Sequence, residues 1–220
     1  MIPKVIHYCW FGGKKKPHLV KKCIKSWKKY APDYQIIEWN ESNFDVHCIK
    51  YCEEAYQLKK WAFVSDVARI FVLLQNGGFY LDTDYELTRP IDDLCKLDFF
   101  TGFENKTQIG FGIFGASKNN PILSKWFDSY KLKNFLVDNK MNMQPIGLFF
   151  MQVFNYKELQ NDNNIFFTNE YFYSPRKNKV SYGIHHYQAS WYTKKEKFIK
   201  FLGPRFTKLV VKIKHLFKKR

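Results

Sequence analysis

The stretch KKWAFVSDVARIFVLLQNGGFYLDTD, residues 59–84, decides the fold that the rest of the chain adopts. Apolar side chains cover most of the helical surface of its first part, which predicts a largely buried helix over residues 59–75. An Asn-Gly-Gly sequence ends that helix, because glycine tolerates the backbone angles found just beyond a helix C-terminus. The apolar run that follows predicts a short strand over residues 79–82.

Two aspartates close this stretch, with one residue between them. Strand side chains alternate between faces, so Asp82 and Asp84 are expected to point the same way. Neighbouring carboxylates repel each other unless a cation lies between them, and paired oxygen ligands suit Mg²⁺ or Mn²⁺. We interpret the pair as the metal end of a nucleotide-sugar site. The alternative is a polar turn after a strand, because Asp-x-Asp is a common sequence.

A second pair of charged residues interrupts the apolar helix. Asp66 and Arg69 are three residues apart and therefore share one helix face. Charges in a buried helix are rarely left unpaired. They either form an internal ion pair that closes the helix onto the sheet, or lie beside the metal and contact the sugar hydroxyls and phosphate of a donor.

These positions fall into one ordered pattern. It reads W-A-x-x-S-D-x-x-R and then G-G-x-Y-x-D-x-D, from Trp61 to Asp84, and the chain opens with I-P-K-x-I-H-x-x-W-F-G from Ile2. The pattern resembles the sugar-binding region of glycosyltransferase family 32, most densely over residues 2–90. That family includes yeast-type mannosyltransferases and many bacterial capsule and lipopolysaccharide transferases, and its core recurs in the glucosylating domains of large clostridial toxins.

The resemblance implies a role for each of these side chains. Asp84 would bind the metal directly, and Asp82 would contact metal, water or ribose. Asp66 and Arg69 would hold the sugar and stabilise the diphosphate, so the implied catalytic residues are Asp66, Arg69 and Asp84. Tyr80 would line the donor pocket. The implied cofactor is Mn²⁺ or Mg²⁺, and the implied donor is a UDP- or GDP-sugar.

Aromatic residues and a late histidine complete the implied site. Trp10 or Phe11, after the first strand, would lie near the nucleotide base, with core packing as the alternative for both. Relatives carry a late histidine followed by Ser-Trp, which here implies His186, or else His185, as a third metal ligand. Adjacent strand residues face opposite ways, so at most one of them fits, and the alternative for the pair is a surface or core histidine. Trp191 would close over the donor.

Strands alternate with helices from residue 4 to residue 82. This order predicts an α/β fold with a mostly parallel twisted sheet flanked by helices, and the resemblance implies its GT-A-like form. His7 in the first strand is expected to be a core histidine. A helix is predicted over residues 120–138 and an edge strand over 165–173, and residues 1–193 are predicted to form one glycosyltransferase domain.

The formal net charge of +16 is concentrated near the C-terminus, where residues 194–220 hold nine Lys and two Arg against one Glu, or +10. Apolar residues in 205–220 recur at helical spacing, which predicts a basic amphipathic helix on an anionic membrane surface. The alternative is a last helix packed on the domain. Five cysteines without a C-x-x-C pair indicate reduced thiols, and no apolar run reaches membrane-spanning length. We therefore expect a peripheral protein on the cytoplasmic face of a membrane.

The predicted function is metal-dependent, retaining transfer of a sugar from a nucleotide-diphosphate donor. The predicted acceptor is a glycan or lipid-linked oligosaccharide in bacterial-type surface polysaccharide synthesis. Two other classes fit part of the sequence: a nucleic-acid-binding protein, suggested by the charge and the 19% of aromatic residues, and a phosphotransferase or nuclease using the same aspartates and metal. Because the charge is gathered in one segment with an apolar stripe, lipid is favoured and no nucleic acid partner is expected.

Overall fold

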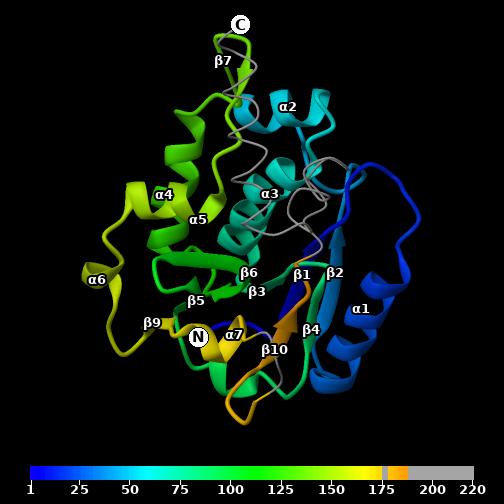
Figure 1. Ribbon diagram of the computed structural model, residues 1–220, viewed down its shortest axis with the longest axis vertical. Helices are drawn as coiled ribbons and strands as arrows, with labels where there is room; N and C mark the ends of the chain where they lie inside the picture. The colour runs from blue at the N-terminus through cyan, green and yellow to red at the C-terminus, as the bar shows by residue number, and fades with distance from the viewer. Residues whose placement is uncertain (175–177, 188–220) are drawn as a thin grey trace, which may run out of the picture. The chain divides into compact units, whose positions relative to one another are not determined.

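The computed structural model describes residues 1–174 and 178–187, and a six-stranded sheet with strand order β2-β1-β3-β6-β5-β9 lies at its centre (Figure 1). Its strands are β1 (Val5–Cys9), β2 (Gln35–Trp39), β3 (Gly78–Leu81), β5 (Phe99–Asn105), β6 (Gln108–Ala116) and β9 (Asn164–Phe167). β1 is parallel to β2 and β3, and β5 is parallel to β9, whereas β6 is antiparallel to both of its neighbours. The sheet is mostly parallel, as predicted.

Helices cover both faces of this sheet (Figure 1). They are α1 (His18–Tyr30), α2 (Lys50–Gln57), α3 (Trp61–Asn76), the 3-10 helix η1 (Asp92–Leu94), α4 (Pro121–Lys131), α5 (Ile146–Val153), α6 (Tyr156–Leu159) and α7 (Asn169–Phe172). Two small sheets join β4 (Tyr85–Leu87) to β10 (Gly183–His185) and β7 (Leu136–Val137) to β8 (Lys140–Met141). Within the described residues, no helix combines the length and the apolar character needed to cross a membrane.

The central strand β3 divides the apolar interior into two cores. Its side chains alternate between faces. Tyr80 packs with residues of α2, α3, α4 and α5, whereas Phe79 and Leu81 pack with residues of α1 and α7. Both faces of β3 are therefore buried, which explains why its sequence is a continuous apolar run.

Helix α3 runs from Trp61 to Asn76, close to its predicted bounds, and two glycines end it. The Gly77 N–H donates to the carbonyl of Leu73, and Gly77 and Gly78 have φ angles of 68° and 112°. A Cβ atom on Gly78 would lie 2.7 Å from the carbonyl oxygen of Val5. The glycines thus let the chain turn from helix into strand directly against β1.

His7 is a fully buried core histidine, as expected, and both of its ring nitrogens are paired. Nε2 lies 2.9 Å from the carbonyl oxygen of Gly77, and the indole N–H of Trp39 donates to Nδ1 at 2.9 Å. The carbonyl can only accept and the indole can only donate, so the imidazole is neutral with its proton on Nε2. Burial lowers the pKa of His7 to about 4.

Acid is expected to destabilise the protein through His7. The unfolded chain binds a proton at His7 near pH 6.5 and the folded chain only near pH 4, so the stabilisation is complete above pH 6.5 and is lost as the pH falls through this window. The slope is about 1.4 kcal/mol per pH unit. Urea unfolding from pH 7 to pH 4 should show it, and the uncharged variant His7→Gln should not.

The variant His7→Gln is needed as a reference because the Asp66 carboxyl changes the stability of the protein with pH in the opposite direction. Burial raises the pKa of the Asp66 carboxyl to about 6, so its contribution to stability decreases as the pH rises through 6. Subtracting the pH dependence of the variant from that of the natural protein removes this contribution. Equal pH dependence in the two proteins would contradict the neutral, buried state of His7.

The segment after α4 differs from the sequence prediction. The helix predicted to reach about residue 138 ends at Lys131, and residues 136–141 form the hairpin of β7 and β8. Glu54 of α2 accepts hydrogen bonds from the backbone N–H groups of Phe135 and Leu136, both at 2.9 Å, and holds the chain out of the helix. The predicted edge strand is also shorter, because the chain turns into α7 after β9.

Candidate metal and donor site

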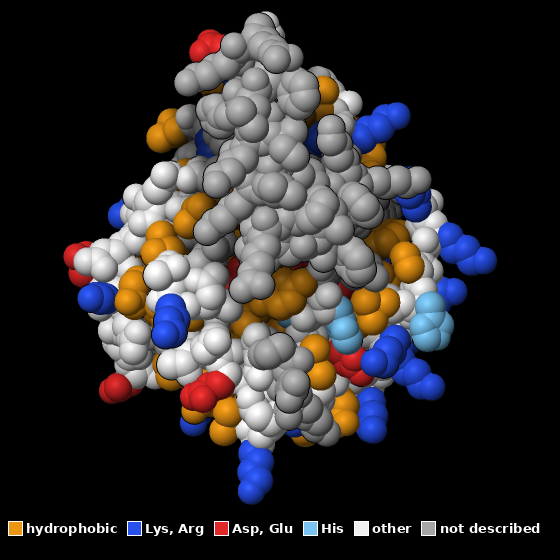
Figure 2. Space-filling model, in the orientation of Figure 1, with side chains coloured by type: hydrophobic (Ala, Val, Ile, Leu, Met, Phe, Trp, Pro, Cys, Tyr) orange, Lys and Arg blue, Asp and Glu red, His pale blue; other side chains and the backbone are white. Residues whose placement is uncertain are grey.

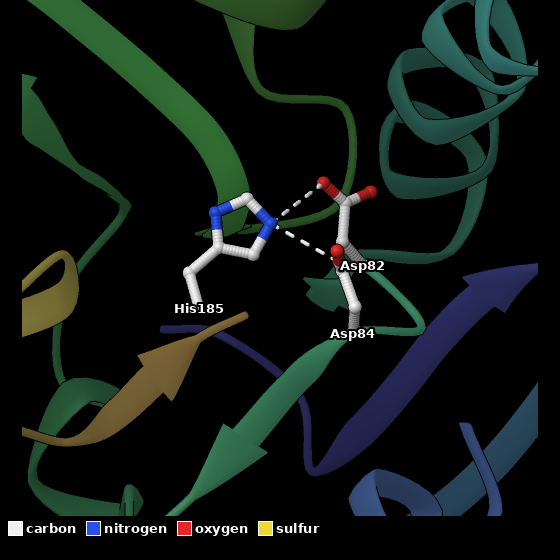
Figure 3. Close-up of side chains that lie close together, drawn as sticks. All are labelled: Asp82, Asp84 and His185. Carbon is white, nitrogen blue, oxygen red and sulfur yellow. Dashed lines mark hydrogen bonds and ion pairs between the residues drawn. The ribbon is translucent and has the colours of Figure 1, made fainter. Parts of the chain in front are cut away.

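Asp82, Asp84 and His185 converge beside the end of β3 (Figure 3). One possible ligand atom from each residue lies within 4.8 Å of the others. The imidazole Nε2 lies 3.1 Å from Asp84 Oδ1 and 3.8 Å from Asp82 Oδ2. Two carboxylates and one imidazole form a donor set that suits Mn²⁺ or Mg²⁺, so the residues present fit a divalent ion.

The two aspartates lie in a turn and not at the end of the strand itself. β3 ends at Leu81 and β4 begins at Tyr85, and the Tyr85 N–H donates to the carbonyl of Asp82 at 2.9 Å. The Asp82 N–H donates to the carbonyl of Gly112 in β6 at 2.7 Å. Strand alternation was therefore the wrong reason for expecting the two carboxylates to lie together, because a turn brings them together.

The choice of His186 over His185 is wrong in this structure. β10 pairs with β4 in an antiparallel register that places His185 opposite Tyr85 and beside the aspartates. His186 Nε2 instead lies 2.9 Å from Glu86 Oε2, and Lys22 lies 2.7 Å from the same oxygen. Neighbouring residues of an extended chain face opposite ways, so the register decides which histidine faces the acids.

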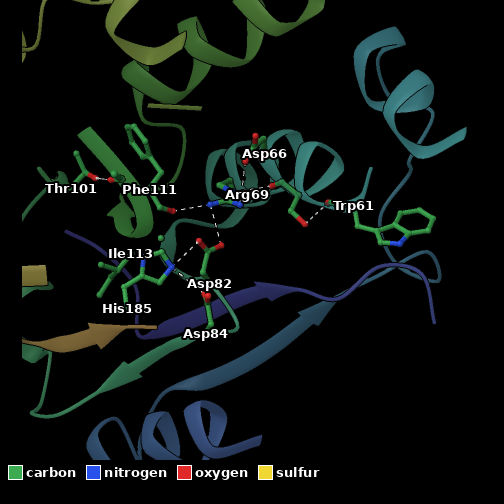
Figure 4. A network of polar contacts seen from close by, with 12 residues as sticks. Trp61, Asp66, Arg69, Asp82, Asp84, Thr101, Phe111, Ile113 and His185 are labelled. Carbon is green, nitrogen blue, oxygen red and sulfur yellow. Dashed lines mark hydrogen bonds and ion pairs between the residues drawn. The ribbon is translucent and has the colours of Figure 1, made fainter. Parts of the chain in front are cut away.

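Arg69 connects the helix charges to the acidic cluster (Figure 4). Its guanidinium lies 3.2 Å from Asp66 Oδ1 and 3.2 Å from Asp82 Oδ1. It also donates to the backbone carbonyls of Ser65 and Phe111, at 3.1 and 2.9 Å. The structure thus contains the internal ion pair of the first alternative and places it beside the aspartate cluster. Contact of Asp66 and Arg69 with a donor stays a prediction.

The ring of Tyr80 packs against the Arg69 guanidinium and is buried, so it does not form the wall of an open pocket. The Arg69 guanidinium lies 4.5 Å from the centre of its ring, and Tyr80 is only 2% exposed. This is a cation–π contact in a buried setting, where such contacts stabilise most. The arrangement fixes the position of Arg69 before any donor binds.

Charge and burial act in opposite directions on this cluster. Burial lowers the pKa of His185, but its hydrogen bond to Asp84 and the charges of Asp84, Asp82 and Glu104 raise it by more, so the net shift is upward. Burial likewise raises the pKa of Asp66 to about 6, although Arg69 opposes the shift. The raised pKa of His185 shows a surplus of negative charge that a divalent cation would neutralise.

The structure gives less support for a site role of the three predicted aromatic residues Phe11, Trp10 and Trp191. Phe11 lies in the core, 6% exposed and in edge contact with Phe44, which leaves little of its ring for a base. Trp10 is partly exposed, and its indole N–H donates to the carbonyl of Lys14. Its contact with a base stays a prediction. Trp191 lies outside the described residues.

Gly112 in β6 lies beside the acidic cluster and was not identified by the sequence motifs. A Cβ atom there would lie 3.0 Å from His185 Cε1 and 3.2 Å from Asp82 Oδ2. The Gly112 N–H donates to the hydroxyl of Tyr173 at 2.9 Å. The missing side chain leaves room for the histidine and the aspartate to approach each other.

Gly112→Ala is expected to weaken metal binding about tenfold, as changes next to ligands typically do. The added methyl group would push His185 and Asp82 apart by a few tenths of an ångström. Calorimetric titration of the purified protein with Mn²⁺ measures this change in affinity. Unchanged affinity for Mn²⁺ would show that the ion does not lie between these residues.

Comparison with known proteins supports the predicted family. Residues 17–100 match the family model described as the glycosyltransferase sugar-binding region containing the DXD motif. The inositol phosphoceramide mannosyltransferase 3 of Schizosaccharomyces pombe is 26% identical over 133 residues, which are 56% of this chain and 35% of that protein. The mannosyl phosphorylinositol ceramide synthase CSH1 of Saccharomyces cerevisiae is 27% identical over 166 residues, 70% of this chain and 42% of that protein. The chain thus spans less than half the length of these relatives.

Solved structures share the fold. The PaToxG glycosyltransferase superposes with a TM-score of 0.53 at 21% identity, over 72% of this chain and 69% of that chain. A glycosyltransferase involved in glycosylation of the major capsid of PBCV-1 superposes with a TM-score of 0.52 at 12% identity, over 84% of this chain and 95% of that chain. The predicted GT-A-like fold is confirmed. Residues 17–100 match the glycosyltransferase sugar-binding region that contains the DXD motif, which confirms the predicted resemblance to that family.

Proposed function

We propose that this protein is a metal-dependent glycosyltransferase that takes its sugar from a nucleotide-diphosphate donor. One observation carries the proposal. Asp82, Asp84 and His185, from segments a hundred residues apart, meet beside the Arg69 guanidinium. A cation site next to a fixed arginine suits a diphosphate leaving group, whose charge both would neutralise.

Different residues of the chain would bind the diphosphate and the sugar of the donor. Asp82, Asp84 and His185 would hold Mn²⁺ or Mg²⁺, which when bound neutralises charge on the diphosphate. Arg69, held by Tyr80 and two backbone carbonyls, would donate to phosphate oxygens. Asp66 would accept hydrogen bonds from sugar hydroxyls.

The proposed stereochemical outcome is retention at the anomeric carbon. The family resemblance suggests transfer from the same face as the leaving group, with the departing diphosphate accepting the proton of the acceptor hydroxyl. In this scheme the protein needs no nucleophile of its own. Its contribution is positioning and charge, which is what a preorganised arginine and acidic cluster provide.

The acceptor that we propose differs from the one expected from sequence alone. The curated relatives are named for inositol phosphoceramide, a lipid whose headgroup carries an inositol phosphate, and not for a surface polysaccharide. We therefore place an anionic glycolipid headgroup ahead of a lipid-linked oligosaccharide. Activity on each acceptor class, measured with the same donor, separates the two.

Membrane attachment is a further part of the proposal. The predicted basic amphipathic segment 205–220 lies outside the described residues, as does the predicted domain boundary at 193/194. We propose that it holds the enzyme on the anionic cytoplasmic face of a membrane, where each lysine near anionic lipid contributes about 1 kcal/mol. Deleting residues 205–220 should abolish sedimentation with phosphatidylserine vesicles. Unchanged sedimentation would remove this part of the proposal.

Thermal unfolding with nucleotide-sugars tests the central proposal. A ligand that binds only the folded protein raises the melting temperature by mass action. One UDP- or GDP-sugar should raise it in the presence of Mn²⁺ and not without metal. If none does so with any divalent ion, the proposal is wrong.

Salt-sensitive binding of RNA or DNA would instead favour the nucleic-acid alternative. In Figure 2, the Lys and Arg side chains of the described residues are spread around the edge of the visible face and do not form one dense patch there. Consumption of nucleic acid, with nucleotide-sugar left intact, would favour the nuclease alternative.

A further inference from the structure

Lys133, just after α4, lies among aromatic rings with its ammonium group half-buried. The Nζ atom lies 3.7 Å from the ring centre of Phe149, 5.5 Å from that of Tyr51 and 5.7 Å from that of Tyr130. It donates one hydrogen bond, to Gln144 Oε1 at 2.8 Å. The rings and the amide hold the charge in one place.

The backbone around Lys133 is also fixed. Its own N–H donates to the carbonyl of Tyr130, and the carboxylate of Glu54 accepts from the N–H groups of Phe135 and Leu136. The N–H of Asn142 donates to the carbonyl of Phe135 at 2.7 Å. A lysine on a segment held in this way is positioned in advance, which reduces the entropy lost when it binds a ligand.

The charge of Lys133 is incompletely paired within the part of the chain that the structure describes. No carboxylate there lies within 4.0 Å of Nζ, and Gln144 uses one of the three N–H groups of the ammonium. Burial lowers the pKa of Lys133 to about 8, and the charge of Asp66 opposes that shift. Lys133 is therefore still protonated at neutral pH, with donors to spare.

The position of Lys133 relates it to the sugar end of the site. Phe135, two residues after Lys133, packs against Phe63 of α3 with 5.1 Å between the ring centres. Phe63 precedes Asp66 by about one helical turn on α3. The charge of Asp66 also acts on Lys133, and Arg69 joins Asp66 to Asp82. Lys133 thus lies at the Asp66 end of this series of charges and not at the metal end. The ring of Tyr51 lies beside the same ammonium, and the buried hydroxyl of Tyr51 has no hydrogen-bond partner among the described residues.

We propose that Lys133 is a specificity-determining residue that binds an anionic oxygen of the substrate beside the transferred sugar. The inference rests on the proposed function and goes beyond it, because it selects a substrate that carries a carboxylate or a phosphate at this point. A partly desolvated ammonium is compensated far better by an anionic oxygen than by a neutral hydroxyl. The anion is either the carboxylate of a uronic acid donor or the phosphodiester of the acceptor headgroup.

Three variants of the full chain test the proposal. Lys133→Met keeps the apolar stem among the rings and removes the charge, and Lys133→Arg keeps the charge. Lys131→Met is the matched control, because Lys131 lies two residues away, is exposed, pairs with Asp128 and lies over the ring of Phe127. Dissociation constants are measured by calorimetry at pH 7 with Mn²⁺ present.

The ligands form two arms. The donor arm compares UDP-glucuronate with UDP-glucose, and the acceptor arm compares glycerophosphoinositol with inositol in the presence of UDP or GDP. We expect Lys133→Met to weaken the anionic ligand of one arm about tenfold, while its neutral counterpart and the bare nucleotide change less than about twofold. Lys133→Arg should restore most of the affinity, and Lys131→Met should leave it unchanged.

The arm that responds identifies the source of the anion. If Lys133→Met binds both anionic ligands as tightly as the natural protein does, the proposal is overturned while the proposed function stands. The proposal is also overturned if the natural protein binds the anionic ligands no more tightly than their neutral counterparts. If no nucleotide binds the natural protein with Mn²⁺, the proposed function fails as well, and the bare-nucleotide titration shows this directly.

Discussion

Replacing Asp84 by alanine is expected to lower the rate of sugar transfer by about 1000-fold, the effect typical of removing a group that stabilises charge in a transition state. The Asp84 carboxylate faces Asp82 and His185 and lies outside both apolar cores. Its loss should therefore leave the fold intact. Steady-state transfer assays and far-ultraviolet circular dichroism measure the two properties in the same preparation.

The exposed acid Asp128 gives a matched control for this change. Asp128 pairs with Lys131 on the surface of α4, and Asp128→Ala should leave turnover unchanged. Retained turnover in Asp84→Ala would exclude Asp84 from the site. Loss of the circular dichroism signal would instead mean that the carboxylate is needed for folding.

Replacing Arg69 by methionine is expected to reduce the free energy of unfolding by about 3–5 kcal/mol, because it leaves the buried carboxylate of Asp66 without its partner. Arg69 is 6% exposed and lies between Asp66, which is 7% exposed, and Asp82. Its hydrogen bonds to two backbone carbonyls are lost in the same change. Urea unfolding monitored by tryptophan fluorescence gives the difference.

Two further variants show whether the cost comes from the unpaired charge. Asp66→Asn combined with Arg69→Met should recover part of the lost stability, since it removes one uncompensated carboxylate. Arg89→Met is the surface control, because Arg89 pairs with Asp93 at 3.4 Å where both side chains are at least 40% exposed, and its cost should be under about 1 kcal/mol. Equal costs for Arg69→Met and Arg89→Met would contradict the buried network.

The sequence was most informative where local pattern and tertiary structure agree. Residues 59–84 form α3, β3 and the acidic turn almost within their predicted bounds, because a long apolar helix followed by glycines has few alternatives. The apolar spacing after α4 continues through Leu132, Phe135 and Leu136, so sequence alone predicts a longer helix. The helix ends earlier because the backbone N–H groups of Phe135 and Leu136 donate to the carboxylate of Glu54, about eighty positions earlier in the chain.

The wrong choice between His185 and His186 also depends on a tertiary contact that the local sequence does not encode. Whether His185 or His186 faces the aspartates depends on the register of β10 on β4, and a shift of one residue exchanges the two side chains. Nothing in the local sequence fixes that register. The role of Gly112 is likewise visible only when β6 is placed beside the acidic turn.

The pairing of β10 with β4 has a consequence for how the protein is made. Asp84 leaves the ribosome 101 positions before His185, which arrives on the last described strand. A nascent chain that ends before Gly183 contains every strand of the large sheet and both acids, yet lacks the imidazole. The three possible ligands therefore come together only after β10 has been synthesised, so nascent chains that end before Gly183 are expected to bind manganese more weakly than chains that include β10.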